Sequence, residues 1–298
     1  MIGFLGAAAP AGYRPFVDGF RRGLAEAGFN EGQNVDVIYR WAEGQYDRLP
    51  MLAAELVSRR VSVIVATGGL PSSLAAKAAT NAIPIVFTLG SDPIKFGLVS
   101  SLNRPGKNIT GVTLFAYLLD AKRVELIHEL VPDSNVIALL VNPNSPQAEP
   151  QAADVESAAN KFGQQLIVLK ASTAPEIDNA FQTLVDNQAK ALLVSADPFF
   201  LGRRNQLVAE AARHSTPTIY EWREFADAGG LMSYGVSLPD AYRQAGDYVG
   251  RILNGANPAD LPILQPTKFE FVINLITAKT FALKIPPKIL ALADDVIE

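Results

Sequence analysis

Hydrophobic and polar positions in the first third of the chain follow two different periods. Short apolar runs are typical of buried strands, and apolar residues three or four positions apart are typical of helices. Phe16, Phe20 and Leu24 share one helix face, and Gly28 ends that helix. Asp47 is predicted to cap the next helix. The predicted strands are 2–6, 34–39, 61–66 and 83–88, and a third helix is predicted at 72–79.

The same order of elements begins again near residue 136. Strands are predicted at 136–141, 166–169, 191–195 and 217–220, and helices at 149–162, 200–214 and 239–253. A further helix begins with Ser172 or Thr173 as its cap, followed by Glu176 in the first turn. A last strand and helix run from 268 to about 283. Strands that alternate with helices over short connections indicate parallel sheets covered on both faces.

The recurrence predicts an α/β fold of two Rossmann-like lobes joined by a hinge of several chain crossovers. No low-complexity linker separates the two series, and the boundary is placed at a short extended piece, 111–114, before a helix beginning about Tyr117. The late elements indicate that the chain crosses more than once, and such crossovers can bend as a hinge. The predicted lobes are 1–114 plus about 236–262, and about 115–235 plus 263–298.

The composition excludes several classes of protein. Hydrophobic residues make up 49% and charged residues 19% of the chain, which excludes a disordered protein. The net charge of −4 argues against a nucleic-acid partner, because binding phosphates needs clustered Lys and Arg. The chain has no cysteine, and no apolar run approaches the roughly 20 residues of a membrane helix.

Small polar residues follow several of the predicted strands. The strand 83–88 runs into Thr88-Leu89-Gly90-Ser91-Asp92-Pro93, and the strand before it runs into 67–73. In the second series the loops 141–145 and 194–198 have the same character. The carboxyl ends of parallel strands meet at one edge of a sheet, where open α/β sheets bind ligands. We therefore expect the two sets of loops to form two walls of a ligand cleft.

Each polar residue in these loops has a structural interpretation beside the functional one. Ser72 and Ser73 open a helix, so their hydroxyls and the free N–H groups suit a carboxylate, but one of them can also be the helix cap. Ser91 and Asp92 can likewise cap a helix that begins at Ile94.

Acidic and aromatic residues follow the strands of the second series. Asp197 and Glu221 can each pair with an ammonium group from which water is excluded, while Asp197 can also cap the helix that Pro198 begins. Phe199, Tyr220 and Trp222 stand beside these acids and can close over a flat apolar ligand or belong to the core.

No motif for catalysis or nucleotide binding is present. The first loop, Gly3 to Pro10, lacks the spacing of a dinucleotide site, and no Walker, His-Glu-x-x-His or Gly-x-Ser-x-Gly sequence occurs. The only two histidines, His128 and His214, lie in predicted helices and are expected to be structural. We expect no catalytic residue, no metal and no cofactor.

Three separated segments resemble one family, the tryptophan/tyrosine-type substrate-binding proteins of ABC transporters. They are Asn30–Val35 with Tyr39–Gly44, Gly90–Pro93 with Asn103–Val112, and Phe271–Leu275 with Ile285–Pro287. The resemblance spans essentially the whole chain. It implies a type I periplasmic-binding-protein fold, with the ligand between two α/β lobes, three crossovers, export, and delivery to a membrane permease. An export signal does not precede the first strand, and we expect that it was removed.

The strand ends and the resemblance together predict a monomer that captures a small carboxylate-bearing ligand, an aromatic amino acid or a related compound. Such a protein acts in the periplasm or on the cell surface. By analogy with amino-acid-binding relatives, hydroxyls and helix N-termini of lobe 1 hold the carboxylate, and an acid of lobe 2 holds the ammonium. The predicted ligand-binding residues are Ala8, Thr67, Gly68, Ser72, Ser73, Thr88, Ser91, Asn142, Asp197, Phe199, Tyr220 and Glu221. The alternatives are a ligand-sensing regulatory domain of the same fold and a two-lobed transferase.

Overall fold

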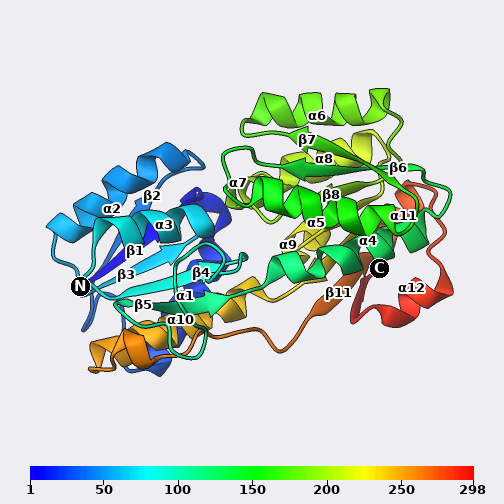
Figure 1. Cartoon of the computed structure of the whole chain (residues 1–298). Coiled ribbons are helices and arrows are strands. Elements are labelled where there is room, and N and C mark those ends of the chain that lie inside the picture. The colour runs from blue at the N-terminus through cyan, green and yellow to red at the C-terminus, as the bar shows by residue number, and fades with distance from the viewer. The chain divides into compact units, whose positions relative to one another are not determined.

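The computed structural model describes all residues from 1 to 298, which form two compact units. Unit 1 comprises Met1–Phe115 and Leu238–Thr267, and unit 2 comprises Ala116–Ser237 and Lys268–Glu298 (Figure 1). The chain therefore passes from one unit to the other three times. None of its helices is long and apolar enough to cross a membrane.

Unit 1 is built on a five-stranded parallel sheet with the order β2-β1-β3-β4-β5. Its strands are β1 (Ile2–Gly6), β2 (Val37–Trp41), β3 (Val63–Thr67), β4 (Ile85–Leu89) and β5 (Ile109–Thr113). All are wholly buried except the edge strand β2. The first three residues of the extended piece expected at 111–114 belong to strand β5, which already begins at Ile109. Gly111 makes this strand difficult to recognise in the sequence, because glycine is uncommon inside strands. Glycine is nevertheless required at this position, because a Cβ there would lie 2.3 Å from the carbonyl oxygen of Phe87.

Four α-helices cover the two faces of this sheet. They are α1 (Arg14–Glu26), α2 (Leu49–Ser58), α3 (Leu70–Ala79) and α10 (Leu238–Leu253). Helices α2 and α3 pack on one face, while α1 and α10 pack together on the other (Figure 1). The cap expected at Asp47 is wrong, because a 3-10 turn over Tyr46–Arg48 leads directly into α2.

Helices α1 and α10 approach each other backbone to backbone through glycines. A Cβ at Gly23 of α1 would lie 1.8 Å from the carbonyl oxygen of Arg243, and one at Gly246 of α10 would lie 2.1 Å from that of Phe20. Real Cβ contacts are never so short, so neither position accepts a side chain unless the helices separate. This contact holds α10 against α1. Helix α10 belongs to unit 1, although the chain reaches it only after passing through unit 2.

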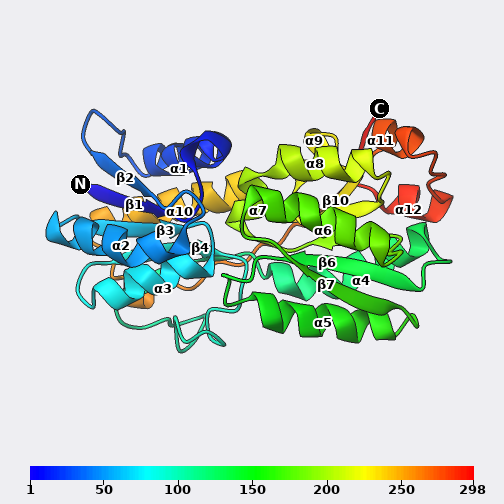
Figure 2. The same cartoon turned by 90° about the horizontal axis from the view of Figure 1, so that it is seen from above.

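Unit 2 contains a seven-stranded sheet with the order β12-β11-β10-β9-β8-β6-β7. Three of its strands, β10, β6 and β7, are labelled in Figure 2. Its strands are β6 (Val136–Val141), β7 (Gln165–Lys170), β8 (Leu192–Val194), β9 (Thr218–Tyr220), β10 (Met232–Gly235), β11 (Glu270–Asn274) and β12 (Asp295–Ile297). Neighbouring strands are parallel except β10 and β11, which are antiparallel. The expectation of parallel α/β sheets is confirmed, with this one exception where the chain re-enters unit 2.

The helices of unit 2 lie on both faces of its sheet, with α4 and α5 on one side and α6 and α8 on the other (Figure 1). They are α4 (Asp120–Leu130), α5 (Ala148–Asn160), α6 (Ala174–Asp186), α7 (Pro198–Gly202), α8 (Arg204–Arg213), α9 (Arg223–Asp227), α11 (Leu275–Thr280) and α12 (Pro287–Leu292). The predicted capping box of Thr173 and Glu176 is confirmed. The single helix expected at 200–214 is wrong, because the chain leaves helical geometry at Arg203, after Gly202.

Glu224, in the first turn of α9, is a half-buried acid with an altered proton affinity. Loss of hydration raises the pKa of its carboxyl group to about 7, and the nearby Asp227 and Glu270 contribute to the increase. The folded state therefore holds a proton on Glu224 that the unfolded chain releases above about pH 4.5. This contribution to stability is complete below the unfolded pKa and is lost as the pH rises through 7.

We expect Glu224→Gln to flatten this part of the pH dependence. At pH 8 the variant should be more stable than the unmodified protein by about 1–2 kcal/mol, because one pKa unit corresponds to about 1.4 kcal/mol and the water that reaches this carboxyl reduces the full effect. At pH 4.5 the two should differ little. Urea unfolding at both pH values measures the difference. Glu156→Gln, which removes an exposed acid from the same unit, is the control; an equal gain in that control would contradict the assignment to Glu224.

Candidate functional site

The carboxyl edge of the unit 1 sheet brings together the polar residues that follow β3 and β4. Thr67 ends β3, Thr88 lies beside it in β4, and both side chains are buried. The chain then turns through Gly68 and Gly69, with φ of +80° and +91°, into helix α3. Only glycine adopts this conformation readily. The turn directs the N-terminus of α3, with its unsatisfied N–H groups, toward the strand ends.

Ser72 and Ser73 use their hydroxyl protons inside this turn. Ser72 Oγ donates to the carbonyl oxygens of Thr67 (2.7 Å) and Gly69 (3.0 Å), and Ser73 Oγ donates to that of Gly69 (3.0 Å). The expectation that one serine caps the helix is wrong, because Gly69 is the N-cap and no side chain fills that role. A hydroxyl has one proton to donate, so a serine engaged in this way is a poor donor to a carboxylate. The contact of Ser72 or Ser73 with a ligand stays a prediction.

Thr88 differs from the serines, because its buried Oγ1 makes no hydrogen bond. Beside it lies the hydroxyl of Tyr242, a residue of α10 that the sequence analysis did not select. Burial raises the pKa of Tyr242 to about 12, and its interactions with Thr67, Thr88 and the backbone of Gly68 oppose the increase. A tyrosine on the buried face of a helix needs a partner for its hydroxyl, and this was the available signal in the sequence.

Ser91 and Asp92 follow β4 at the same edge. Asp92 Oδ1 accepts hydrogen bonds from the backbone N–H groups of Ile94 (2.8 Å) and Lys95 (3.1 Å). These bonds close a turn, so the helix expected to begin at Ile94 is wrong. Ser91 is buried, and its carbonyl oxygen accepts from Thr113 Oγ1 at 3.1 Å. Ala8 is also buried, in the loop after β1.

In unit 2 the residues that follow β6 and β8 interact directly. Asn142 Nδ2 donates to Asp197 Oδ1 at 3.0 Å, and the same oxygen accepts from the backbone N–H of Phe199 at 2.9 Å. Asp197 is therefore the N-cap of α7, as one of its two interpretations predicted. The side-chain amide of Asn142 and the backbone amide of Phe199 are both uncharged donors. Asn142 and Asp197 are almost fully buried.

Glu221, which follows β9, belongs to a buried charge network. Its Oε1 accepts from Arg123 Nη1 (3.1 Å) and Gln151 Nε2 (3.2 Å), and the same two side chains bind Asp120 (2.7 and 3.1 Å). Loss of hydration raises the pKa of both acids, and the charge of Arg123 opposes the increase. The sequence analysis missed Asp120, Arg123 and Gln151, because their polar character on α4 and α5 does not distinguish them from surface residues.

One protein family matches nearly the whole chain. The sequence model for the ABC transporter substrate binding protein family matches residues 10–297. The chain belongs to this family. Its members act outside the cytoplasm with the permeases of ABC transporters, and the resemblance predicted from three segments of the sequence is confirmed.

Relatives of known structure or binding function support this membership. The tyrosine-binding protein of Clostridioides difficile (strain R20291) is 27% identical over 261 residues, which are 88% of this chain and 74% of the relative. A conserved domain protein from Vibrio cholerae has a TM-score of 0.90 at 26% identity, over 99% of this chain and 98% of that one. An ABC domain from Streptococcus pneumonia in complex with L-Trp has a TM-score of 0.88 at 25% identity over all of both chains.

Aromatic residues of this substrate-binding protein gather beside the carboxyl edge of unit 1. The ring of Trp41, at the end of β2, covers Gly6, where a Cβ would lie 2.3 Å from the ring. Tyr13 meets Trp41 edge to face with ring centroids 6.0 Å apart and meets Tyr242 in the same way at 6.4 Å. Trp41 is half-buried. The sequence analysis did not select Tyr13 or Trp41, although Trp41 lies within a segment that carries the family resemblance.

The aromatic residues predicted in unit 2 are mostly part of its core. Tyr220 is fully buried and stacks on Phe225, with ring centroids 4.4 Å apart. Phe199 packs beside Phe200 in α7 and is 9% exposed. This packing supports the core interpretation of Tyr220 and leaves Phe199 as the aromatic residue adjacent to Asp197.

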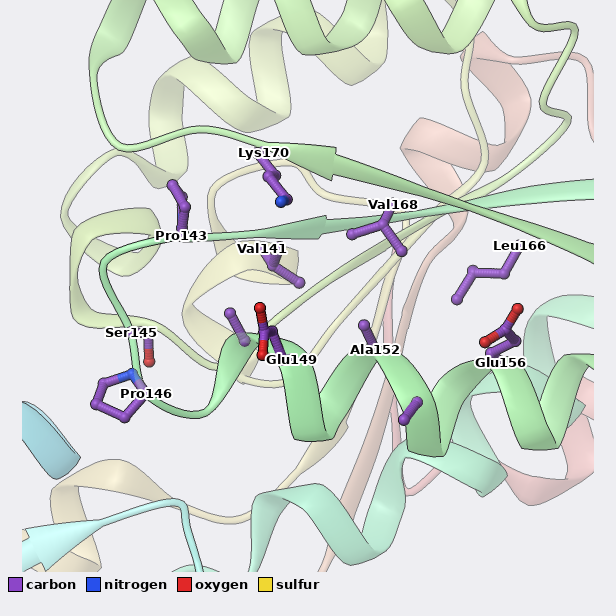
Figure 3. Close-up of a pocket in the computed structure, with 12 residues that line it drawn as sticks. Val141, Pro143, Ser145, Pro146, Glu149, Ala152, Glu156, Leu166, Val168 and Lys170 are labelled. Carbon is purple, nitrogen blue, oxygen red and sulfur yellow. The ribbon is translucent and has the colours of Figure 1, made fainter.

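Unit 2 also has a groove of about 580 Å³ between helix α5 and the edge strand β7 (Figure 3). Val141, Leu166 and Val168 form its apolar wall, while Glu149 and Glu156 extend from α5 opposite them. None of the predicted ligand-binding residues lines this groove. No cluster of three or more His, Asp or Glu side chains in the chain is arranged to hold a metal ion.

Proposed function

We propose that this substrate-binding protein captures an aromatic amino acid, with L-tryptophan and L-tyrosine as the first candidates. The observation that carries the proposal is the free, buried hydroxyl of Thr88 beside the N-terminus of α3. A buried donor without a partner is costly, and a bound acceptor would remove that cost. The tyrosine-binding relative and the relative with bound L-Trp support an aromatic amino acid as that acceptor.

The ligand carboxylate is assigned to unit 1. The N-terminus of α3 carries a partial positive charge and unsatisfied N–H groups, which suit an anion. Thr88 Oγ1 and the hydroxyl of Tyr242 add two side-chain donors at the same place. Ser72 and Ser73 are assigned a structural role: their hydroxyl groups donate to the carbonyl oxygens of Thr67 and Gly69 and so stabilise the turn.

The ligand ammonium is assigned to Asp197 of unit 2, in preference to Glu221. Glu221 shares the guanidinium of Arg123 with a second acid, and its charge is thereby offset within unit 2. Asp197 is almost fully buried, and the amides of Asn142 and Phe199 fix the position of its carboxylate. A buried carboxylate can form a strong charge-assisted hydrogen bond with an incoming cation. Trp41, Tyr13 and Phe199 are the aromatic residues proposed to contact the side chain of the ligand.

The proposed role is capture and delivery without chemical change of the ligand. The protein would act as a monomer in the periplasm or on the cell surface and would release the ligand to an ABC permease. It would need neither cofactor nor metal and would bind no nucleic acid. Both the family and its relatives are binding proteins, which disfavours the alternatives of a regulatory sensing domain and a transferase.

A thermal-shift screen over the common amino acids and simple aromatic acids tests the proposal. L-tryptophan or L-tyrosine at 100 times its Kd should stabilise the protein by about 2.7 kcal/mol. Indole-3-propionate, which lacks the ammonium, and tryptamine, which lacks the carboxylate, should bind far more weakly. Stabilisation by either analogue equal to that by the amino acid would contradict the proposal that both the carboxylate and the ammonium of the ligand are recognised. Stabilisation only by non-aromatic compounds would contradict the proposed ligand class.

We expect Tyr242→Phe to weaken binding of the captured amino acid about tenfold. The change removes one hydroxyl from the carboxylate site, and a hydrogen bond to a charged group contributes about 1.5–3 kcal/mol. The apo melting temperature should change little, because the phenylalanine ring keeps the contacts with Tyr13 and Phe16. Isothermal titration calorimetry measures the affinity, with Tyr248→Phe on the same helix as the control. An unchanged Kd would remove Tyr242 from the site.

A further inference from the structure

The guanidinium of Arg123 is the centre of the buried network in unit 2, and two of its partners are backbone carbonyl oxygens. Besides the two acids, Nε donates to Tyr234 O at 2.9 Å and Nη1 donates to Ala116 O at 3.1 Å. The residue is 1% exposed. An arginine that binds carbonyl oxygens from two distant parts of the chain fixes the distance between those parts.

Both carbonyl groups belong to segments where the chain passes between the two units. Ala116 is the first residue of unit 2 after the first crossing. Tyr234 lies in β10, shortly before the second crossing at Ser237. The third crossing, at Lys268, leads into β11, which pairs with β10 so that Phe271 lies opposite Tyr234. Arg123 therefore binds two crossings directly and contacts the strand beside the third.

The carbonyl oxygen of Tyr234 is available to Arg123 because strand β9 is too short to pair with β10 at that residue. Strand β9 pairs with β10 only at Met232 and Ser233, because β9 ends at Tyr220. The carbonyl oxygen of Tyr234 can thus accept from a side chain in place of a neighbouring strand. At the next residue, Gly235, a Cβ would lie 1.7 Å from the carbonyl oxygen of Glu221, so these two backbones are in direct contact.

Glu221 connects the crossings to the carboxyl edge of the sheet. It follows β9, binds Arg123, and accepts a hydrogen bond from the backbone of Ala196, next to Asp197. Gln151 holds Glu221 and Asp120 from α5 but does not bind the crossing segments. The network therefore has one member, Arg123, that joins the acids to the crossings, and another, Gln151, that only supports the acids.

We infer that Arg123 is a positioning residue for ligand capture: it holds the unit 2 ends of the chain crossings in one arrangement relative to the loops that carry Glu221 and Asp197. The inference rests on the proposed function for its effect on affinity. Its structural part, restriction of the crossings, holds for the ligand-free protein as well. Arg123 acts through these segments and needs no contact with the ligand.

The test uses Arg123→Lys, which keeps the positive charge between the two acids but cannot reproduce the fork of donors to both carbonyl oxygens. The chain has no cysteine, so nitroxide labels can be attached at Met51→Cys in unit 1 and Val185→Cys in unit 2, both at exposed positions. Pulsed electron paramagnetic resonance on the ligand-free protein measures the distribution of label distances. We expect Arg123→Lys to broaden this distribution, and the Kd for L-tryptophan or L-tyrosine to rise about tenfold.

Gln151→Leu is the matched control, because it removes a hydrogen-bond donor to Asp120 and Glu221. It leaves the hydrogen bonds from Arg123 to the crossing segments in place. If Gln151→Leu broadens the distribution as much as Arg123→Lys, or if Arg123→Lys leaves it unchanged, the inference is wrong. Should Arg123→Lys fail to fold, the neutral combination of Asp120→Asn, Arg123→Met and Glu221→Gln removes the carbonyl contacts without leaving a buried charge, and the same outcomes apply. Absence of amino-acid binding by the unmodified protein would overturn the proposed function alone, since the label distances need no ligand.

Discussion

Replacing Asp197 by asparagine is expected to weaken binding of L-tryptophan or L-tyrosine by about 100-fold. Loss of one charged partner from a buried, hydrogen-bonded pair costs about 2–5 kcal/mol, and 100-fold corresponds to about 2.7 kcal/mol. Asparagine keeps an oxygen that can accept from Phe199 N and from Asn142, and it is a good N-cap. The fold should therefore be retained, with an apo melting temperature close to that of the unmodified protein.

Isothermal titration calorimetry on Asp197→Asn and Glu221→Gln distinguishes the two acids. Glu149→Gln is the control for a change of net charge, because it removes an acid from the groove of the same unit (Figure 3). If Glu221→Gln abolishes binding while Asp197→Asn does not, the ligand ammonium binds Glu221, and the proposed preference for Asp197 is wrong. If neither change matters, the ligand carries no ammonium that unit 2 recognises.

Gly23→Ala is expected to lower the free energy of unfolding by about 2–3 kcal/mol, because overpacking costs about 1–3 kcal/mol or more and here the obstacle is backbone. The added methyl group would lie 1.8 Å from the carbonyl oxygen of Arg243. The helix-forming advantage of alanine, about 1 kcal/mol, offsets only part of this. Urea unfolding measures the loss, and Gly202→Ala, where a Cβ meets nothing within 4 Å, is the control.

The same substitution should also reduce ligand affinity. Arg243 directly follows Tyr242, so a helix α10 that moves away from α1 carries the Tyr242 hydroxyl away from Thr67 and Thr88. We expect Gly23→Ala to raise the Kd under conditions where the variant is fully folded. A destabilised variant with unchanged affinity would show that α10 adjusts at another part of the helix and that the Tyr242 hydroxyl stays in place.

Local elements could be predicted because their signals are local. The buried strand Val136–Val141 and the capping box at Thr173 depend on neighbouring residues, and the structure has both as expected. The failures were also local in origin. Gly111 weakened the pattern of β5, and the polar turn after Asp92 resembled the start of a helix.

The candidate site could be predicted only in part. The sequence analysis selected strand-end residues such as Thr67, Thr88 and Asp197, because parallel strands place their carboxyl ends at one edge. Tyr242 and Arg123 were missed, because each is one polar residue on an otherwise ordinary helix. Their roles come from partners that are far away in the sequence: Tyr242 meets Thr67 and Thr88, and Arg123 binds Tyr234 O and Glu221.

The sequence by itself determined that this protein has an α/β fold of repeated strand–helix units, that its polar strand ends are the candidate binding surface, and that it resembles ABC substrate-binding proteins. Hydrophobic period, helix caps and strand-end chemistry are properties of short segments, so no contact information was needed. Only the tertiary structure decided which hydroxyls keep a free proton, which acid is offset by an arginine, and how closely the backbones of α1 and α10 approach each other. These outcomes depend on hydrogen bonds and close packing between residues that the chain brings together from distant positions, and no local pattern records them.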